Sequence, residues 1–333
     1  MLFNILVGNH GTSFHSLQLL GPLVNYVRSA LSLCGHEVTV ARSTWNEDAV
    51  NLLFEHFPDP QFWIDEIRRA RQEQGCTVGV IATELMVDNT IPYAKNGIYA
   101  SDVAGNEREQ AAYIQKRIAG LNAIAPDVDF MWSFLERTAR EYASRCKLSR
   151  FLPVGHVGGP PAETRRSPKD IDVAFFGTLT PHRAAVIENM TRGGRLNVVA
   201  VGRGTPAGVL PDYVVASLLD RAKIGLNLTL SAVGESTPGL DPRFASCIRV
   251  VQMLERDLCV VSEEIPLDNP YQAFMSSAPP EGLAETCLQL LGTGEWRERG
   301  AGNAARFRER MDVRKACAPV IDETLSALNA AGR

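Results

Sequence analysis

Residues suited to binding an anion gather in the second half of the chain, where an apolar run ends. Residues 173–176 are apolar, Gly177 and Thr178 follow them, and a helical pattern begins near Arg183. Glycine lets the backbone turn tightly and leaves space for a ligand, and the unpaired N–H groups at the start of a helix carry partial positive charge. The helix dipole does not favour an arginine at the start of a helix. An anion bound by both the helix N-terminus and Arg183 would explain why an arginine stands there.

Other polar residues follow further apolar runs of this half. They are Arg203, Asn227, Ser262 and Glu263, together with Arg249 on a helix that leads into the last of these runs. A diphosphate requires cations held in place and backbone N–H donors, and three arginines on the ligand side of one sheet would meet that requirement. Each arginine taken alone is as readily explained as a solvated or ion-paired surface residue.

The first half carries residues suited to proton transfer. His10 and His15 lie in the loop after the first apolar run, and an imidazole with a pKa of about 6.5 could accept a proton from a hydroxyl nucleophile. Glu84 and Asp88 follow a later apolar run and could act as a base or orient an acceptor. The competing interpretations are loop histidines bonded to backbone carbonyls, and solvated loop acids.

Metal and dinucleotide sites are less well supported. Asp127 and Asp129, and likewise Asp170 and Asp172, form Asp-X-Asp pairs, but both pairs come at the leading end of a predicted strand. Ligands of such folds lie beyond the carboxyl ends of the strands, so we expect turn acids and no metal site. The loop after the first apolar run lacks the G-x-G-x-x-G pattern, which argues against a dehydrogenase.

Alternating strands and helices must position these residues. In the first half, the predicted strands cover residues 3–7, 37–41, 77–82, 129–133 and 150–154, and the predicted helices cover 16–33, 47–57, 60–74, 106–125 and 136–147. In the second half, the predicted strands cover 173–176, 196–201, 223–228, 258–262 and 274–278, and the predicted helices cover 181–192, 212–222, 243–255, 280–291, 294–310 and 313–328. This alternation predicts parallel sheets covered on both faces.

Length and composition are those of a globular protein with two domains. The chain has 333 residues, of which 45% are hydrophobic and 22% charged, and residues 155–161 form a Gly/Pro-rich linker. A net charge of −4 gives no reason to expect a nucleic-acid or membrane-surface partner. Seven scattered cysteines without a C-x-x-C pair indicate reduced thiols. With neither a signal peptide nor an apolar run of about 20 residues, we expect a cytoplasmic protein without a membrane span.

Several strings of the second half resemble a known family. Residues 170–178, DIDVAFFGT, with Arg183 after them, resemble the "DIDVLFYG…R" opening of the donor domain in a bacterial group of GT-B glycosyltransferases related to the spore-maturation type. Three further stretches resemble other motifs of that group and occur in the same order. They are FLPVG at 151–155, AKIGLNL at 222–228, and Arg249 followed by VVSE at 260–263. The first half resembles the family in architecture alone.

This resemblance implies the α/β GT-B fold, in which two Rossmann-like domains face each other across a cleft. The implied division is an N-terminal acceptor domain at 1–155, a hinge at 156–169, a donor domain at 170–312, and a C-terminal helix at 313–333 that packs back toward the first domain. That last helix is amphipathic, and its apolar stripe would be a sticky surface if it were left in water.

The activity implied by the resemblance is sugar transfer from a nucleotide-diphosphate sugar, UDP- or GDP-linked, without a metal ion or other cofactor. The acceptor would be a small molecule, a glycan or a protein. The resemblance assigns Gly177 and Arg183 to the diphosphate, and it assigns Asn227, Arg249 and Glu263 to the donor pocket.

Mechanism and function class stay open at this point. Many retaining enzymes of this fold carry two glutamates at the places where this chain has Phe244 and Gln252. An inverting enzyme would need a base from the first half, with the two loop histidines preferred to the two acids, whereas a retaining enzyme would need none. The other interpretations are a nucleotide-sugar epimerase of the same bilobal plan and a non-catalytic, two-lobed ligand-binding protein.

Overall fold

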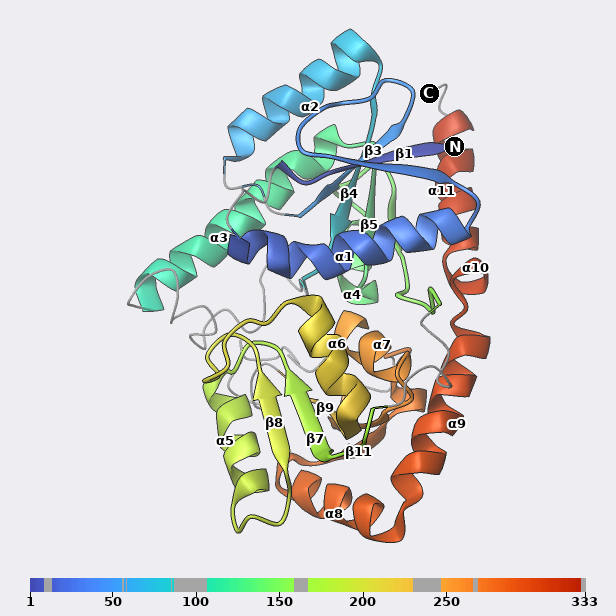
Figure 1. Ribbon diagram of the computed structural model, residues 1–333. Coiled ribbons are helices and arrows are strands. Elements are labelled where there is room, and N and C mark those ends of the chain that lie inside the picture. Colours follow the sequence, from blue (N-terminus) through green and yellow to red (C-terminus); the bar gives the residue numbers. More distant parts are fainter. Residues whose placement is uncertain are drawn as a thin grey trace. The chain divides into compact units, whose positions relative to one another are not determined.

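The computed structural model describes residues 1–8, 14–55, 57, 59–84, 86, 107–158, 167–229, 247–265 and 269–330, except for the side chains of 14–19 and 107–114. These residues divide into two compact units. The first unit joins described residues before Gly158 to a C-terminal segment that starts at Asp312, and the second unit runs from Gly158 to Met311. Each unit is built around a parallel sheet (Figure 1). None of the described helices is long and apolar enough to cross a membrane, and all seven cysteines are free thiols.

The sheet of the first unit has six parallel strands in the order β2-β1-β3-β4-β5-β6. The strands are β1 (Leu2–Leu6), β2 (Glu37–Ala41), β3 (Val50–Phe54), β4 (Thr77–Ala82), β5 (Phe130–Ser133) and β6 (Ser149–Phe151). The helices are α1 (Phe14–Leu33), α2 (Pro60–Gln74), α3 (Glu107–Ile124), α4 (Glu136–Tyr142), α10 (Val313–Ala316) and α11 (Ala318–Ala330). The strand order reverses between β1 and β3, so the carboxyl ends of these strands flank the switch point where such sheets bind ligands.

The helix predicted at 47–57 is wrong, because Val50–Phe54 form the strand β3. All side chains of this strand are buried, and it pairs with β1 on one side and β4 on the other. A strand covered on both faces shows a continuous apolar run instead of alternation, and so short a run cannot be told from a turn of buried helix by its periodicity.

The connection from β2 to β3 crosses β1 without a helix. Residues 42–49, here called the strap, are held by two buried asparagines, Asn4 on β1 and Asn51 on β3. Asn51 donates its Nδ2–H to the Asn46 carbonyl at 2.8 Å, and its Oδ1 accepts the Asn46 N–H at 3.0 Å. Asn4 donates its Nδ2–H to the Thr44 carbonyl at 2.9 Å. These bonds satisfy backbone groups that a helix would have satisfied internally.

The C-terminal segment packs within the first unit. The single helix predicted at 313–328 is instead two helices, α10 and α11, which are separated at Cys317. On α11 the side chains of Ile321 and Thr324 are buried. Trp132 on β5 is fully buried and donates its Nε1–H to Thr324 Oγ1 at 3.0 Å, and α10 lies against α1. The last helix therefore covers part of the core of the first unit.

The sheet of the second unit has five parallel strands in the order β11-β10-β9-β7-β8. The strands are β7 (Ile171–Phe176), β8 (Val198–Val201), β9 (Ala222–Asn227), β10 (Cys259–Glu263) and β11 (Ser276–Ala278). The helices are α5 (Pro181–Thr191), α6 (Asp212–Arg221), α7 (Cys247–Leu254), α8 (Leu283–Thr293) and α9 (Glu295–Arg310). The order reverses between β7 and β9, so the loops after these two strands flank the switch point of this sheet.

Candidate functional site

The turn after β7 requires glycine because of its close packing. Gly177 has a φ of +139°, and a Cβ at this position would lie 2.6 Å from Nη2 of Arg249. Gly202, which follows β8, has a φ of +129°, and a Cβ there would clash with the Gly177 carbonyl oxygen. The loops after these two strands therefore approach each other and Arg249 as closely as a bare backbone allows.

Arg183 ties together the loops on the two sides of the switch point. Thr180 caps α5 by accepting the Arg183 backbone N–H at 3.3 Å. The buried guanidinium donates through Nη1 to the Thr178 carbonyl at 2.7 Å, through Nη2 to the Leu228 carbonyl at 2.8 Å, and through Nε to the Thr229 carbonyl at 2.9 Å. Since the first of these carbonyls follows β7 and the other two follow β9, Arg183 sets the shape of the site as well as its charge.

A second buried guanidinium, that of Arg249 on α7, lies close to the first. It lies 5.3 Å from the ring centroid of Phe175 and 6.0 Å from that of Phe176, and Arg183 lies 5.5 Å from that of Phe175. Its hydrogen bond to a described residue runs from Nη1 to the Leu228 carbonyl at 3.3 Å. Burial lowers the pKa of Arg249 to about 10, and burial followed by the charge of Arg249 lowers the pKa of Arg183. Both side chains stay charged at neutral pH.

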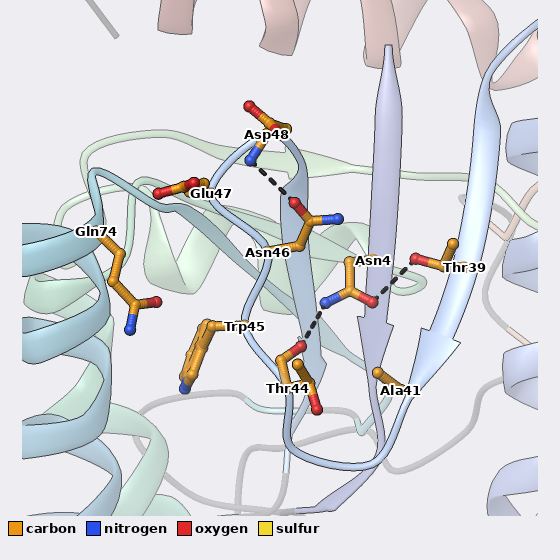
Figure 2. A pocket seen from close by; sticks show the side chains of 9 residues that line it. All are labelled: Asn4, Thr39, Ala41, Thr44, Trp45, Asn46, Glu47, Asp48 and Gln74. Atoms are coloured by element: carbon orange, nitrogen blue, oxygen red, sulfur yellow. Dashed lines mark hydrogen bonds between the residues drawn. The ribbon is translucent and has the colours of Figure 1, made fainter.

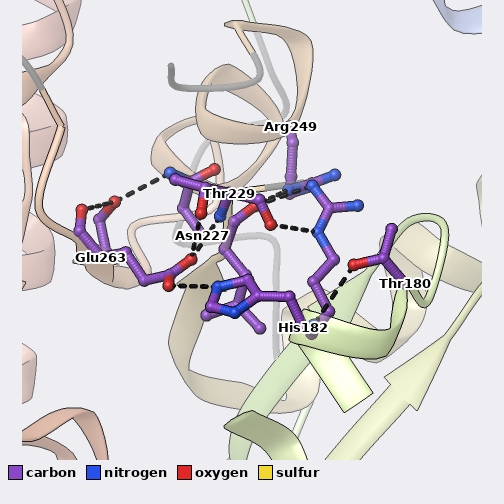
Figure 3. Close-up of polar contacts among 9 residues, drawn as sticks. Thr180, His182, Asn227, Thr229, Arg249 and Glu263 are labelled. Carbon is purple, nitrogen blue, oxygen red and sulfur yellow. Dashed lines mark hydrogen bonds and ion pairs between the residues drawn. The ribbon is translucent and has the colours of Figure 1, made fainter. Parts of the chain in front are cut away.

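Glu263, the last residue of β10, is the carboxylate of this cluster (Figure 3). Its Oε2 accepts the Thr229 hydroxyl at 2.9 Å, and its Oε1 lies 2.6 Å from Nε2 of His182. Neither Arg183 nor Arg249 forms an ion pair with a carboxylate that the structure describes. Among the described residues, two buried guanidinium groups therefore accompany one carboxylate, which is bonded to His182 and Thr229 and pairs with neither arginine. Such an excess of buried positive charge favours an anion.

Two further predicted site residues lie beneath this cluster. Asn227 and Ser262 are fully buried at the ends of β9 and β10. Asn227 Nδ2 donates to Ser262 Oγ at 2.9 Å, and that hydroxyl donates to the Glu263 carbonyl at 2.7 Å. These two residues hold the strand ends together and have no surface to offer a ligand. Arg203 is half-buried after β8, where its carbonyl accepts the Leu179 N–H at 2.7 Å.

A second polar cluster lies at the carboxyl edge of the first unit's sheet. Glu84 forms an ion pair with Arg117 of α3, with 3.1 Å between Oε1 and Nη1, and Nη2 of Arg117 lies 3.4 Å from Oε1 of Glu55. Glu55 follows β3 and accepts the backbone N–H and the hydroxyl of Thr83 at 2.9 Å and 2.8 Å. Burial raises the pKa of Glu55 to about 8 despite the charge of Arg117. Of the residues in this cluster, Glu84 alone was predicted.

The remaining acid–base candidates cannot be compared with this cluster. His10 and Asp88 lie outside the described residues. His15 falls in α1, but its side chain is also outside them. The described part of the chain therefore leaves Glu84 as the candidate whose surroundings are known.

Sequence reasoning missed His182 and Thr229 in the first cluster, and Glu55, Thr83 and Arg117 in the second. His182 precedes Arg183 and Thr229 comes two positions after Asn227, so both stand at strand ends that had already been singled out. Glu55 was missed for a different reason, because a helix was expected over its position. An acid directly after the apolar run 50–54 would have been the signal once that run was read as a strand.

The Asp-X-Asp pairs lie at the amino ends of β5 and β7. Asp129 forms an ion pair with Arg71 at 2.7 Å, and Asp172 forms one with Lys223 at 2.6 Å. Within the described ranges, no group of three or more His, Cys, Asp or Glu side chains could hold a metal ion.

Solved glucosyltransferase structures align with nearly the whole chain. A beta-glucosyltransferase described as a DNA-modifying enzyme aligns with a TM-score of 0.57 and 9% identity, over 98% of this chain and 100% of the other. An alpha-glucosyltransferase in complex with UDP and a 13-mer DNA containing a HMU base aligns with a TM-score of 0.56 and 10% identity, over 98% and 99% of the two chains. For T4 phage BGT in complex with UDP and Mn2+ the TM-score is 0.55 and the identity 11%, over 97% and 99%. The chain has the GT-B fold.

Within this GT-B fold, the arginine cluster belongs to the second of two Rossmann-like units. The fold class expected from the sequence is confirmed. No model of a protein family matches the sequence, and a search of curated proteins finds no match. The likeness at about 10% identity concerns the fold alone, so function has to be argued from the site itself.

Proposed function

We propose that this protein is a glycosyltransferase, which moves a sugar from a nucleotide-diphosphate sugar to an acceptor nucleophile. The observation that carries the proposal is the pair of buried guanidinium groups, Arg183 and Arg249, at the switch point of the second sheet. Neither forms an ion pair with a described carboxylate. A diphosphate is an anion that two such groups can share, and the turn at Gly177 brings backbone close to the same place.

The proposed chemistry makes use of this charge when the sugar leaves. The acceptor attacks the anomeric carbon, the bond from that carbon to the diphosphate oxygen breaks, and the nucleoside diphosphate departs with added negative charge. Arg249 makes one hydrogen bond to a described residue, and its other guanidinium N–H groups, which bond no described residue, would stabilise that charge in the transition state. Because arginines can do this work, we propose that the reaction does not need a metal ion.

The donor and acceptor classes belong to the same proposal. UDP is present in two of the aligned structures and uridine diphosphoglucose is the substrate named for the third, so a UDP-sugar is the donor to test first and a GDP-sugar the second. The acceptor is a small molecule, a glycan or a protein, since a net charge of −4 does not favour the DNA named for two of these enzymes. Seven free thiols fit a cytoplasmic enzyme.

A binding panel followed by a turnover assay tests the proposal. We expect UDP or GDP, and their sugars, to raise the melting temperature, because a ligand that binds the folded state alone stabilises it. We also expect release of the nucleoside diphosphate from its sugar, unaffected by EDTA. Interconversion of the sugar without release would indicate an epimerase, and binding without any turnover would indicate a binding protein. No shift with any nucleotide would refute the proposal.

A further inference from the structure

The strap of the first unit borders a pocket that the proposed donor site does not use (Figure 2). Its volume is about 610 Å³, within the range of roughly 300–1,000 Å³ that small-molecule sites occupy. The lining comes from residues 44–48 of the strap, from three side chains of β1 and β2, and from Gln74 at the end of α2. It shares no residue with the cluster of Glu55, Arg117 and Glu84.

The strap presents its side chains on a backbone that is held in place. The buried asparagines of β1 and β3 bond the carbonyls of Thr44 and Asn46 from below. Asn46 Oδ1 also accepts the Asp48 N–H at 3.0 Å. The side chains of Trp45, Glu47 and Asp48 make no hydrogen bond or ion pair with a residue that the structure describes. The backbone that carries them is therefore held in place, while their polar atoms have no hydrogen-bond partner among the described residues.

The chemistry of these side chains selects the kind of ligand. Trp45 is half-buried and offers a flat apolar ring with an N–H donor. Glu47 and Asp48 are exposed carboxylates that accept hydrogen bonds, and the exposed amide of Gln74 can both donate and accept. None of the described lining residues is Lys, Arg or His, so a phosphate or nucleotide would meet two uncompensated negative charges. A sugar ring has a C–H face to stack on an indole and hydroxyl groups to donate to carboxylates.

We propose that this pocket binds a neutral saccharide unit of a glycan acceptor. The Trp45 ring lies against one face of the sugar, and Glu47 and Asp48 accept its hydroxyl groups. This narrows the acceptor to a glycan and in that respect rests on the proposed function. Because the pocket shares no residue with the cluster of Glu55, Arg117 and Glu84, it holds a sugar unit other than the one that reacts.

Titration of the full chain with neutral oligosaccharides, in the absence of any nucleotide, tests this proposal. Maltotriose, cellotriose and chitotriose serve as probes, with calorimetry and tryptophan fluorescence as readouts. We expect at least one of them to bind, and Trp45→Ala to raise its Kd by about tenfold through loss of stacking area. Glu47→Lys should do the same, and since Glu47 is exposed this variant is expected to fold. Phe62→Ala is the matched control, because Phe62 is another exposed aromatic of the same unit, at 52% exposure.

Three results would overturn the saccharide site. One is the absence of binding by every probe up to about 10 mM. Another is binding that Trp45→Ala and Glu47→Lys leave unchanged, and the third is binding of choline or spermidine in preference to the sugars, which would mark a cation site. Since the titration uses no nucleotide, its outcome is independent of nucleotide-diphosphate release, which tests the transferase proposal by itself.

Discussion

The two buried arginines of the second unit have different surroundings and therefore different expected roles. Arg183 donates to three carbonyl groups on both sides of the switch point. Arg249 donates to a single described carbonyl and lies against Gly177. We therefore expect Arg249 to contact the anion directly, and we expect Arg183 to maintain the shape of the site while its charge also attracts the anion.

Arg249→Ala should weaken the binding of a nucleoside diphosphate by about ten- to a hundred-fold, the usual effect of losing a charge-assisted contact worth roughly 1.5–3 kcal/mol. Isothermal titration measures it directly. Arg195→Ala is the control, because Arg195 is an arginine of the same unit whose side chain is 65% exposed. Equal affinities for the wild type and Arg249→Ala, with the fold intact, would remove Arg249 from the donor site.

Arg183→Ala should first of all reduce stability. The substitution leaves three carbonyl groups in a buried turn without their donors and opens a cavity, at a cost of roughly 3 kcal/mol. Urea unfolding followed by circular dichroism would show the midpoint falling much further than in Arg249→Ala. A variant as stable as the wild type would mean that water replaces the lost donors.

Glu55 should make stability depend on pH. Its pKa is 4.5 in an ordinary setting and is raised to about 8 here, mainly by burial. Between these values the folded chain keeps a proton that the unfolded chain has lost, so the free energy of unfolding falls as pH rises through this window and levels off above it. The fall should exceed about 1.4 kcal/mol, the equivalent of one pKa unit.

Urea unfolding at pH 5, 6.5 and 8.5 measures this dependence. Glu55→Gln resembles the protonated acid and should flatten the profile, while Glu37→Gln, which changes an exposed carboxyl group, should not. The groups that act on Glu55 are Arg117, Glu84 and Thr83. Parallel profiles for wild type and Glu55→Gln would show that Glu55 is ionised in the folded chain.

The sequence could place Arg183 after the end of an apolar strand and Arg249 on the helix that leads into a later one, because apolar runs and glycines mark the ends of strands. It could not distinguish their roles, since burial and carbonyl partners depend on loops that meet only in the folded sheet. Likewise, Asn227 and Ser262 stand at strand ends, where ligand-binding residues are expected, but their side chains are fully buried and bond each other. A position at a strand end is visible in sequence, whereas the direction of the side chain is not.

At the scale of elements, alternation predicted nearly every strand and helix that the structure describes, and it failed at β3. The run Val50–Phe54 is buried on both faces, so it lacked the period that separates strand from helix. The prediction also assumed that a helix must join parallel strands. The strap does this without one because Asn4 and Asn51 satisfy its backbone. These two asparagines also bond each other, although they are far apart in sequence.

The hydrogen bond between Thr324 of α11 and Trp132 of β5 can be tested as an anchor of the last helix. Thr324 accepts the N–H of Trp132 and donates its own hydroxyl to the Val320 carbonyl at 2.7 Å. Thr324→Val keeps the shape but removes the acceptor, so it should destabilise the protein by about 1–2 kcal/mol. Glu323 lies on the same helix and forms an exposed ion pair with Arg150 of β6. Glu323→Ala breaks that pair and should cost less than about 0.5 kcal/mol. Equal effects of the two changes on denaturant unfolding would contradict the anchoring role of Thr324.

At the scale of the whole molecule, the second unit is inserted into the first. The chain leaves the first unit after Val157 and re-enters it at Asp312. The two chain segments at this boundary lie next to each other. The Val313 N–H donates to the His156 carbonyl at 3.1 Å, and His156 and Asp312 form a parallel β-bridge. Joining 157 to 312 through two glycines should therefore give a folded first unit without nucleotide affinity.

Thermal melting and UDP titration of this shortened chain would test the expectation. A cooperative transition without a UDP-dependent shift is the expected result. If the shortened chain is unfolded, the first unit depends on the second for its stability. If it binds UDP like the full chain, the donor site has been assigned to the wrong unit.

The insertion also sets the order in which the molecule can be completed during its synthesis. A ribosome, which adds about 5–20 residues per second, synthesises all of residues 158–311 before it synthesises the last helix. Trp132 must wait for Thr324, which is made 192 residues later. The second unit is therefore complete first, and the first unit keeps an apolar surface uncovered until α11 has been made. A nonsense mutation between residues 312 and 324 would leave a complete second unit attached to an incomplete first one.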